Sequence, residues 1–264
     1  MTRPKIIDAF PFNDELDILT CRLTELGDAV DHFVIVECEV NHQDRPKPLW
    51  FAEHAERFAP WADKIVHVIA KDLPTVRDDP DPWSREMAQR EWIGEGLDRI
   101  GIHSDDVILQ SDVDEIPRAL QARNARPGGL IAFQQRLHCF AVDWLHPEMW
   151  RGTVAGTARA VTALGPLKFG KMRGTRNHAP CPSGFEDAGW HMSWLGGREP
   201  SLRKLGSFCH TEISEQTEPG LRDDFYLREG WHVDGKKMRP VDVDESWPRW
   251  VFGRHCPENW FRPR

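Results

Sequence analysis

Short apolar runs alternate with amphipathic stretches through the first half of the chain. Residues 6–10, 33–36, 65–69 and 107–110 are runs of mostly aliphatic, β-branched and aromatic residues. Such runs are typical of strands that are buried on both faces. Helical spacing appears between them, and the alternation of strand and helix signals predicts a layered α/β domain.

Two of the predicted helices have recognisable ends. Leucines at positions 16, 19, 23 and 26 recur with helical spacing and are followed by Gly27, a residue that commonly ends helices. Asn13 is the predicted N-cap of this helix, with two acidic residues in its first turn. Ser84 is the predicted cap of a second helix, whose apolar stripe comprises Ile93, Leu97 and Ile100.

The second half has a different composition. A strand is predicted at 130–133, but from Arg151 onward the chain is rich in Gly, Pro, Trp and His. Such stretches are usually loops, and loops on a rigid sheet often carry binding groups. The chain shows no internal repeat or linker, so residues 1–264 are predicted to form one domain.

The composition narrows the classes of protein to which the chain can belong. The chain has 34 Lys and Arg against 42 Asp and Glu, a net charge of −8, which argues against a surface built mainly for nucleic acid or anionic membrane. Its six cysteines lack Cys-x-x-Cys spacing, so neither a zinc site nor a disulfide framework is indicated. We also expect no signal peptide and no membrane span, and hence a cytoplasmic location, because no 18 consecutive residues are apolar.

An acidic motif, residues 111–117 with the sequence SDVDEIP, directly follows the predicted strand 107–110. In open α/β sheets, ligands bind at the carboxyl ends of such strands. Asp112 and Asp114 could both reach a hard divalent cation, which in turn neutralises a diphosphate. The motif therefore predicts a metal and phosphate site, although a solvated loop can produce Asp-x-Asp by chance.

Four further residues are candidates for this chemistry. Arg90 and Arg22 each fall on the apolar face of a predicted helix, where a buried guanidinium needs an anion. For Arg90, that anion is either an internal ion-pair partner, a phosphate or the acidic motif itself. His191 lies in a segment, 189–197, that is too rich in Gly and Trp for an ordinary helix or strand to be expected, and His210 follows it. Either imidazole could complete the coordination of a manganese-like ion.

Seven segments, taken in order from about residue 6 to 215, resemble glycosyltransferase family 17. They are residues 8–10 with 13–15, 22–28 with 30–31, 33–37, 46–49, 111–117, 150–153 and 189–197. The resemblance implies a GT-A architecture with a mixed, mainly parallel sheet flanked by helices. It also implies a nucleotide-sugar half at about 1–117 and an acceptor-side half at about 118–264.

The resemblance further implies metal-dependent, inverting transfer of a sugar from a nucleotide-sugar donor, such as UDP-N-acetylglucosamine, to a hydroxyl of a glycan or polysaccharide. The expected cofactor is Mn²⁺ or Mg²⁺, held by Asp112, Asp114 and His191. The expected donor-binding residues are Phe10, Glu37, Arg90, Asp112, Trp190, Lys204 and His210. Inversion requires a general base, for which we favour Asp187, with Glu115 and Glu212 as alternatives.

Two other functions remain open on the sequence alone. Residues 236–264 contain seven Lys or Arg against four Asp or Glu, a local basic bias that would suit transfer to hydroxymethylated DNA, although the overall charge opposes it. The 12 tryptophans could instead stack on sugars in a lectin-like module that is not an enzyme. Nucleotide binding separates these classes, because a lectin should ignore UDP.

Overall fold

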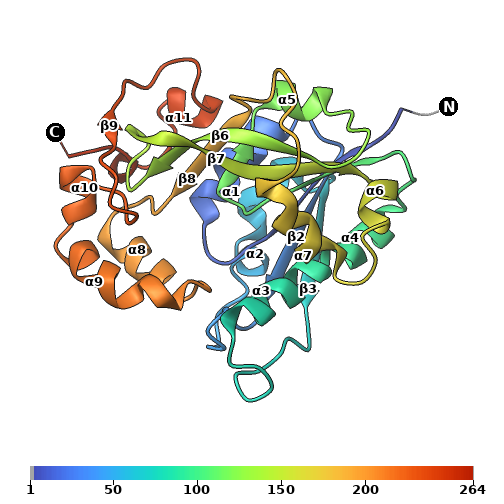
Figure 1. Cartoon of the computed structure of the whole chain (residues 1–264), viewed down its shortest axis with the longest axis horizontal. Helices are drawn as coiled ribbons and strands as arrows, with labels where there is room; N and C mark the ends of the chain where they lie inside the picture. Colours follow the sequence, from blue (N-terminus) through green and yellow to red (C-terminus); the bar gives the residue numbers. More distant parts are fainter. Residues whose placement is uncertain (1–2, 264) are drawn as a thin grey trace.

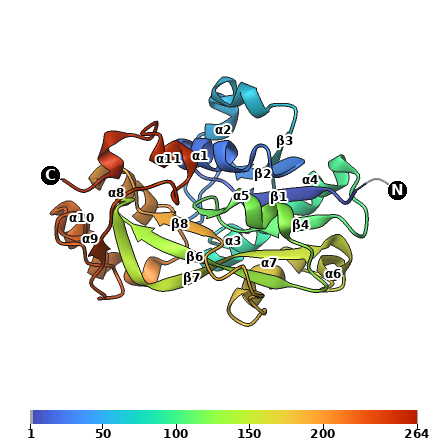
Figure 2. The ribbon, with the colours of Figure 1, turned by 90° about the horizontal axis from the view of Figure 1, so that it is seen from above.

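The computed structural model describes residues 3–263, which are built around one mixed β-sheet (Figures 1 and 2). Its strand order is β3-β2-β1-β4-β7-β6-β8-β5, with β9 paired to β7. The strands are β1 (Ile6–Pro11), β2 (His32–Cys38), β3 (Ile65–Ala70), β4 (Val107–Gln110), β5 (Glu115–Pro117), β6 (Ile131–Cys139), β7 (Trp144–Thr157), β8 (Gly189–Ser193) and β9 (Arg239–Pro240).

Helices flank this sheet, most of them short. They are α1 (Leu16–Leu26), α2 (Trp50–Glu53), α3 (Pro82–Glu91), α4 (Ile93–Ile100), α5 (Ala119–Asn124), α6 (Ala158–Thr162), α7 (Lys168–Gly174), α8 (Arg198–Leu205), α9 (Ser214–Arg222), α10 (Phe225–Glu229) and α11 (Arg249–Phe252). Short 3₁₀ segments lie at Ala55–Trp61, Thr175–Asn177, Thr211–Ile213 and Glu258–Trp260. None of the helices described in residues 3–263 is long and apolar enough to cross a membrane.

The four strands predicted in the first half form a continuous parallel part of the sheet, and β6 and β8 also pair in parallel. β1 pairs in parallel with β2 and β4, and β2 pairs in parallel with β3. Antiparallel pairing begins at β7, which lies between β4 and β6. The prediction of an α/β fold with a mixed sheet flanked by helices is therefore confirmed.

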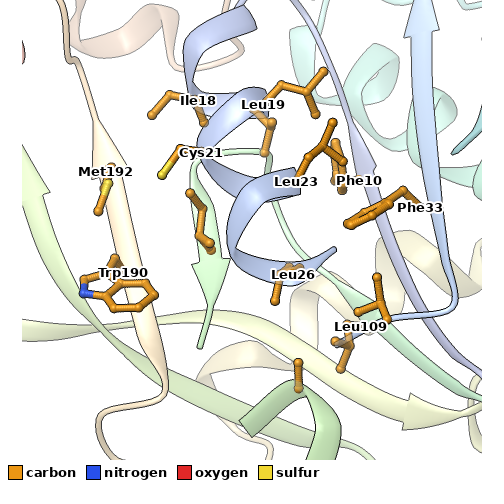
Figure 3. Close-up of a cluster of buried hydrophobic side chains, with 14 of the residues drawn as sticks. Phe10, Ile18, Leu19, Cys21, Leu23, Leu26, Phe33, Leu109, Trp190 and Met192 are labelled. Atoms are coloured by element: carbon orange, nitrogen blue, oxygen red, sulfur yellow. The ribbon is translucent and has the colours of Figure 1, made fainter. Parts of the chain in front are cut away.

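Alternate residues of the central strands enter different apolar clusters. Phe10 of β1 packs with Leu19 and Leu23 of α1, as Figure 3 shows. Ile7 and Ala9 belong to a second cluster with residues of α4, α6 and α7. Because both faces of β1 are covered, its carboxyl end is a fixed point from which loops can project.

Two predicted helix starts are wrong. The helix predicted to follow Asn13 begins at Leu16, with Glu15 in the N-cap position. Ser84 lies inside α3, which is capped by the side chain of Asp81 accepting a hydrogen bond from the Trp83 backbone. The chain turns at Trp92, so Arg90 and the stripe that starts at Ile93 belong to consecutive helices.

The expectation of a loop-rich second half also needs correction. β7 has 14 residues, and the segment that begins at Gly189 starts as strand β8. β8 lies between β6 and β5, where a Cβ on residue 189 would collide with the Ile116 carbonyl oxygen. Gly189 therefore permits close strand packing rather than a turn. The later elements α8, α9 and α10 gather at the end of the molecule opposite α4 and α6 (Figures 1 and 2).

Candidate functional site

A cavity of about 660 Å³ opens where the parallel strands end. Its wall includes Pro11 at the end of β1, Cys38 at the end of β2 and the loop after β4. Strands β6 and β8 and helices α3, α7 and α8 contribute the remaining sides. Residues 112–114 of the predicted acidic motif therefore lie in the wall of this cavity.

The buried side chain of Arg22 contacts the acidic motif, residues 111–117. Its fully buried guanidinium donates to both carboxylate oxygens of Asp8, at 2.7 and 2.6 Å. It also donates to Ser111 Oγ at 2.6 Å and to the backbone carbonyls of Asp112 and Glu115 at 2.8 and 3.0 Å. Asp8 is thus the anion that the sequence analysis predicts for the buried Arg22. The remaining hydrogen bonds donated by Arg22 orient the loop.

Asp112 is clamped by two guanidiniums. Arg90 of α3 and Arg173 of α7 each donate to one of its carboxylate oxygens, the latter at 2.6 Å. Burial would raise the pKa of Asp112, but the charges of Arg173 and Arg90 outweigh it and hold that pKa well below its usual range. The expectation that Arg90 contacts the acidic loop is confirmed, whereas Arg173 was not foreseen.

Asp114 has a different set of partners. Lys204 Nζ donates to its Oδ2 at 2.8 Å and also to Ser193 Oγ. The Nε2 atom of His191 lies 3.4 Å from Asp114 Oδ1. These positive or polarisable neighbours, Lys204 foremost, overcome burial and lower the pKa of the Asp114 carboxyl. Asp114 is therefore ionised at neutral pH.

Glu115 is fully buried and does not line the cavity. Both Arg173 terminal nitrogens donate to it at 2.7 Å, Trp150 Nε1 donates at 2.6 Å, and the Asp112 backbone donates at 2.9 Å. Because its oxygens are already occupied by four donors and face no open space, the structure favours a structural role over that of a base.

The other two candidate bases also lie outside the cavity wall. Asp187 forms ion pairs with Arg118 at 3.0 Å and Arg136 at 2.8 Å, and 45% of its side chain is exposed. Glu212 is exposed and pairs with His210 at 2.7 Å. Only His210 of this second pair reaches the wall.

Three of the seven expected donor-binding residues are in the core rather than in the cavity wall. Phe10 is fully buried beneath the Arg22 guanidinium. Glu37 is fully buried and accepts a hydrogen bond from the Phe51 backbone. Trp190 is buried beneath Arg118. These three side chains lie on strands and are turned into the core, outside the cavity wall. The other four, Arg90, Asp112, Lys204 and His210, line the cavity, as do Asp114 and His191.

The cavity wall is locally basic, although the chain is acidic overall. Among the described residues it contains five Lys or Arg and four Asp or Glu, namely Lys47, Arg90, Arg173, Arg176 and Lys204 against Glu15, Glu86, Asp112 and Asp114. Within residues 3–263, the one anion that pairs with Arg176 is the distant Glu115 at 3.8 Å, and the Arg176 guanidinium lies over the Trp150 ring. Burial and the neighbouring Arg173 lower the pKa of Arg176, so an added anion would be stabilised there.

Glu15 is a further cavity residue whose chemistry the sequence did not reveal. Its carboxylate accepts backbone hydrogen bonds from Asn13 and Asp14 and forms no ion pair with Lys or Arg in the part of the chain that the structure describes. Burial, together with the negative charges of Asp14 and Asp114, raises the pKa of Glu15 to about 7. In the sequence, Glu15 is an acidic residue near the start of a helix, and that context gave no sign of its raised pKa.

The candidate metal ligands are only partly assembled. Among residues 3–263, two groups of three potential ligands approach closely: His42 with Glu86 and Cys209, and His146 with His232 and Asp234. Neither group includes Asp112 or Asp114. Asp114 and His191 are nevertheless close enough to bind one ion together, and His191 Nδ1 is buried without a hydrogen-bond partner.

A cavity with this charge pattern, at the carboxyl ends of parallel strands, is typical of α/β proteins that bind phosphorylated ligands. The model of glycosyltransferase family 17 matches residues 1–212, and the chain belongs to that family. The mixed sheet flanked by helices agrees with the architecture that the resemblance implied.

The chain is similar to the rat (Rattus norvegicus) protein named beta-1,4-mannosyl-glycoprotein 4-beta-N-acetylglucosaminyltransferase. The two are 27% identical over 281 residues, which cover 92% of this chain and 51% of the relative. The chain thus spans about half the length of the curated relatives it matches.

Two solved structures show weaker similarity. A 4-diphosphocytidyl-2C-methyl-D-erythritol synthase has a TM-score of 0.38 and 14% identity, covering 83% of this chain and 100% of the other. An active-site mutant of LgtC has a TM-score of 0.36 and 11% identity, covering 73% of each chain.

Proposed function

We propose that this protein transfers a sugar from a nucleotide-sugar donor, such as UDP-N-acetylglucosamine, to a hydroxyl of a glycan, in a metal-dependent reaction with inversion. The observation that carries the proposal is the meeting of Asp112 and Asp114 with Arg90, Arg173 and Lys204 in one cavity. The Asp114 carboxylate suits a cation, and the surrounding Lys and Arg side chains suit a diphosphate.

The residues present fit a divalent ion at Asp114 and His191. Their facing atoms lie 3.4 Å apart, about the separation expected for two ligands of one ion, and the carboxylate is ionised. Lys204 occupies the other oxygen of Asp114, whereas Arg90 and Arg173 occupy both oxygens of Asp112. Asp114 and His191 are therefore the proposed ligands, and Asp112 the proposed anchor of the two guanidiniums. When bound, the ion would stabilise negative charge on the leaving diphosphate.

Arg176 is the proposed direct phosphate contact of the chain itself. Arg90 and Arg173 are already neutralised by carboxylates, but Arg176 lacks a close anion. A diphosphate beside it would supply one and would add charge-assisted hydrogen bonds.

Glu15 is the proposed proton acceptor. Among the described carboxylates of the cavity wall, it is the one that forms no ion pair with a described Lys or Arg. Its pKa of about 7 places it near the value that suits general bases at neutral pH. Asp187, Glu115 and Glu212 do not line the cavity, which is why we prefer Glu15 to them.

The acceptor is proposed to be a glycan, because the names of the similar proteins describe N-acetylglucosaminyl transfer to a mannosyl-glycoprotein. No feature of the cavity favours DNA. A lectin-like alternative would bind free glycan without nucleotide.

The test is calorimetric titration of UDP with and without Mn²⁺, followed by a screen of nucleotide sugars for hydrolysis and transfer. We expect manganese-dependent UDP binding, which Asp114→Asn should abolish. Thermal unfolding of this variant is measured alongside, because the substitution also removes the charge that pairs with Lys204. Arg176→Gln should weaken UDP binding about tenfold, as expected for one charge-assisted contact of roughly 1.5 kcal/mol. The matched control is Arg198→Gln, whose partner is Asp224 outside the cavity wall. Glycan binding that ignores UDP would reject the enzyme in favour of a lectin.

A further inference from the structure

A rigid hairpin turn near the carboxyl end of the chain faces the start of β7. Trp231 and Lys237 form an isolated antiparallel bridge, and the His232 backbone donates to the Lys236 carbonyl at 2.9 Å. Gly235 closes the turn with a φ of +83°, which favours glycine. Two side chains that could bind a metal, His232 and Asp234, are therefore held two residues apart on a constrained backbone.

The opposing strand supplies a third such side chain. His146 Nε2 lies 3.3 Å from Asp234 Oδ2, and His232 Nδ1 lies 2.8 Å from Asp234 Oδ1. The two imidazole rings are 4.8 Å apart at an angle of 68°. One ligand atom from each residue lies within 4.8 Å of the other two. Zinc bonds of about 2.0–2.1 Å in tetrahedral geometry place neighbouring ligands about 3.3 Å apart, so a small closure would suffice.

His146 provides an independent sign of an absent partner. Its side chain is about 95% buried, and its Nε2 makes no hydrogen bond in the described structure, although Asp234 is near. Its Nδ1 lies 3.3 Å from the Glu148 carbonyl oxygen. The Glu148 backbone N–H also lies 3.1 Å from Nδ1 and can donate to it. A cation on Nε2 would select the tautomer whose Nδ1 carries the proton and donates to the carbonyl instead. Such backbone contacts commonly orient metal-binding histidines.

We propose that His146, His232 and Asp234 form a binding site for a zinc-like divalent cation, separate from the Asp114 and His191 pair. Two imidazoles and one carboxylate favour zinc or a similar late transition metal over magnesium or calcium. Three protein ligands leave at least one coordination position for water or another oxygen ligand. Because His232 also lines the main cavity, the ion would lie at its rim.

Lys236 is the main competitor for this ion. Its ammonium lies 3.5 Å from Asp234 Oδ2, but it also contacts Glu148 at 2.7 Å and is 42% exposed. It can therefore keep Glu148 as its partner when a cation binds Asp234. Removal of its charge by Lys236→Met should strengthen zinc binding.

The experiment is a titration of the chelator-treated full chain with Zn²⁺, using a competing chromophoric chelator and no nucleotide. A parallel titration with Co²⁺ follows the visible absorption that reports imidazole coordination. We expect one site whose affinity falls about 100-fold or more in Asp234→Asn and in His232→Asn. Asp234→Asn is mild for folding, because asparagine can still accept the Lys236 backbone hydrogen bond that caps the turn, and thermal unfolding verifies this.

Three control variants separate this site from the rest of the molecule. Cys209→Ser disrupts the group with His42 and Glu86, Asp114→Asn disrupts the pair with His191, and Asp242→Asn removes a carboxylate outside both groups. Each should retain the wild-type zinc affinity at the proposed site. Wild-type affinity in both Asp234→Asn and His232→Asn would overturn the proposal. Loss of binding in Cys209→Ser or Asp114→Asn alone would also overturn it, because the ion would then belong to another group. UDP binding is measured separately, so neither result depends on the proposed function.

Discussion

Glu115 offers a sharp test of the distinction between a base and a structural anion. We consider Glu115→Gln, which preserves the shape of the side chain but removes its charge and one acceptor oxygen. In the structure, Arg173 donates twice to this carboxylate, and Trp150 and the Asp112 backbone each donate once. The NH₂ group of glutamine would face donors that now bind a carboxylate oxygen.

The magnitude follows from the buried ion pair. Removal of one partner of such a pair typically costs about 3–5 kcal/mol. Arg173 would still contact Asp112 at 2.6 Å, so we expect the lower end, about 3 kcal/mol. With an unfolding entropy of about 2.1 cal/mol/K per residue, a 264-residue chain should then lose about 5 °C in melting temperature.

The assay combines thermal and urea unfolding with transfer kinetics. Exposed Glu212→Gln is the matched control and should unfold like the wild type. The double variant Glu115→Gln with Arg173→Met should be less destabilised than the sum of the single variants, because it leaves fewer uncompensated charges. If Glu115→Gln unfolds like the wild type yet loses transfer by roughly 10²–10⁴, then Glu115 acts as a general base and our reasoning fails.

Two further predictions concern buried charges. Arg22→Lys should destabilise the fold by about 3 kcal/mol in urea unfolding, because an ammonium cannot reach Asp8, Ser111 and the loop carbonyls together. Exposed Arg123→Lys is the control. Equal stability of the two variants would contradict the role of Arg22 in holding the loop. In the folded state the pKa of Glu15 is raised to about 7, so between the two pKa values the folded chain retains a proton that the unfolded chain has released. The contribution of Glu15 to the free energy of unfolding therefore falls as the pH rises from about 4.5 to 7. Glu15→Gln should remove that contribution, and an unchanged slope of stability against pH would contradict it.

Several elements were predictable because their signals are local. The aliphatic runs of β1, β2, β3 and β4 report burial on both faces, whatever lies against them. The position of the acidic loop follows directly from the end of β4. The need of Arg90 for an anion was predicted from an apolar stripe that the structure assigns to the next helix, α4. Arg90 is nevertheless buried, and Glu86 and Asp112 meet that need.

Other features were hidden because a local pattern does not specify its partner. Gly189 looked like a loop residue, but strand β8 forms because β5 and β6 are available on either side of it. The exposed-looking Asp187 meets Arg118 and Arg136, which lie 69 and 51 residues away in the chain.

The charge pattern of the cavity is likewise a product of the tertiary structure. Arg173 reaches Asp112 and Glu115 across 61 and 58 residues, and His146 meets the turn at Asp234 only when that hairpin folds back along β7. The sequence by itself determined which residues must be buried and where the strand ends carry charge. Only the tertiary structure decided which opposite charge neutralises each one, because long-range pairing depends on how the whole chain closes around the sheet.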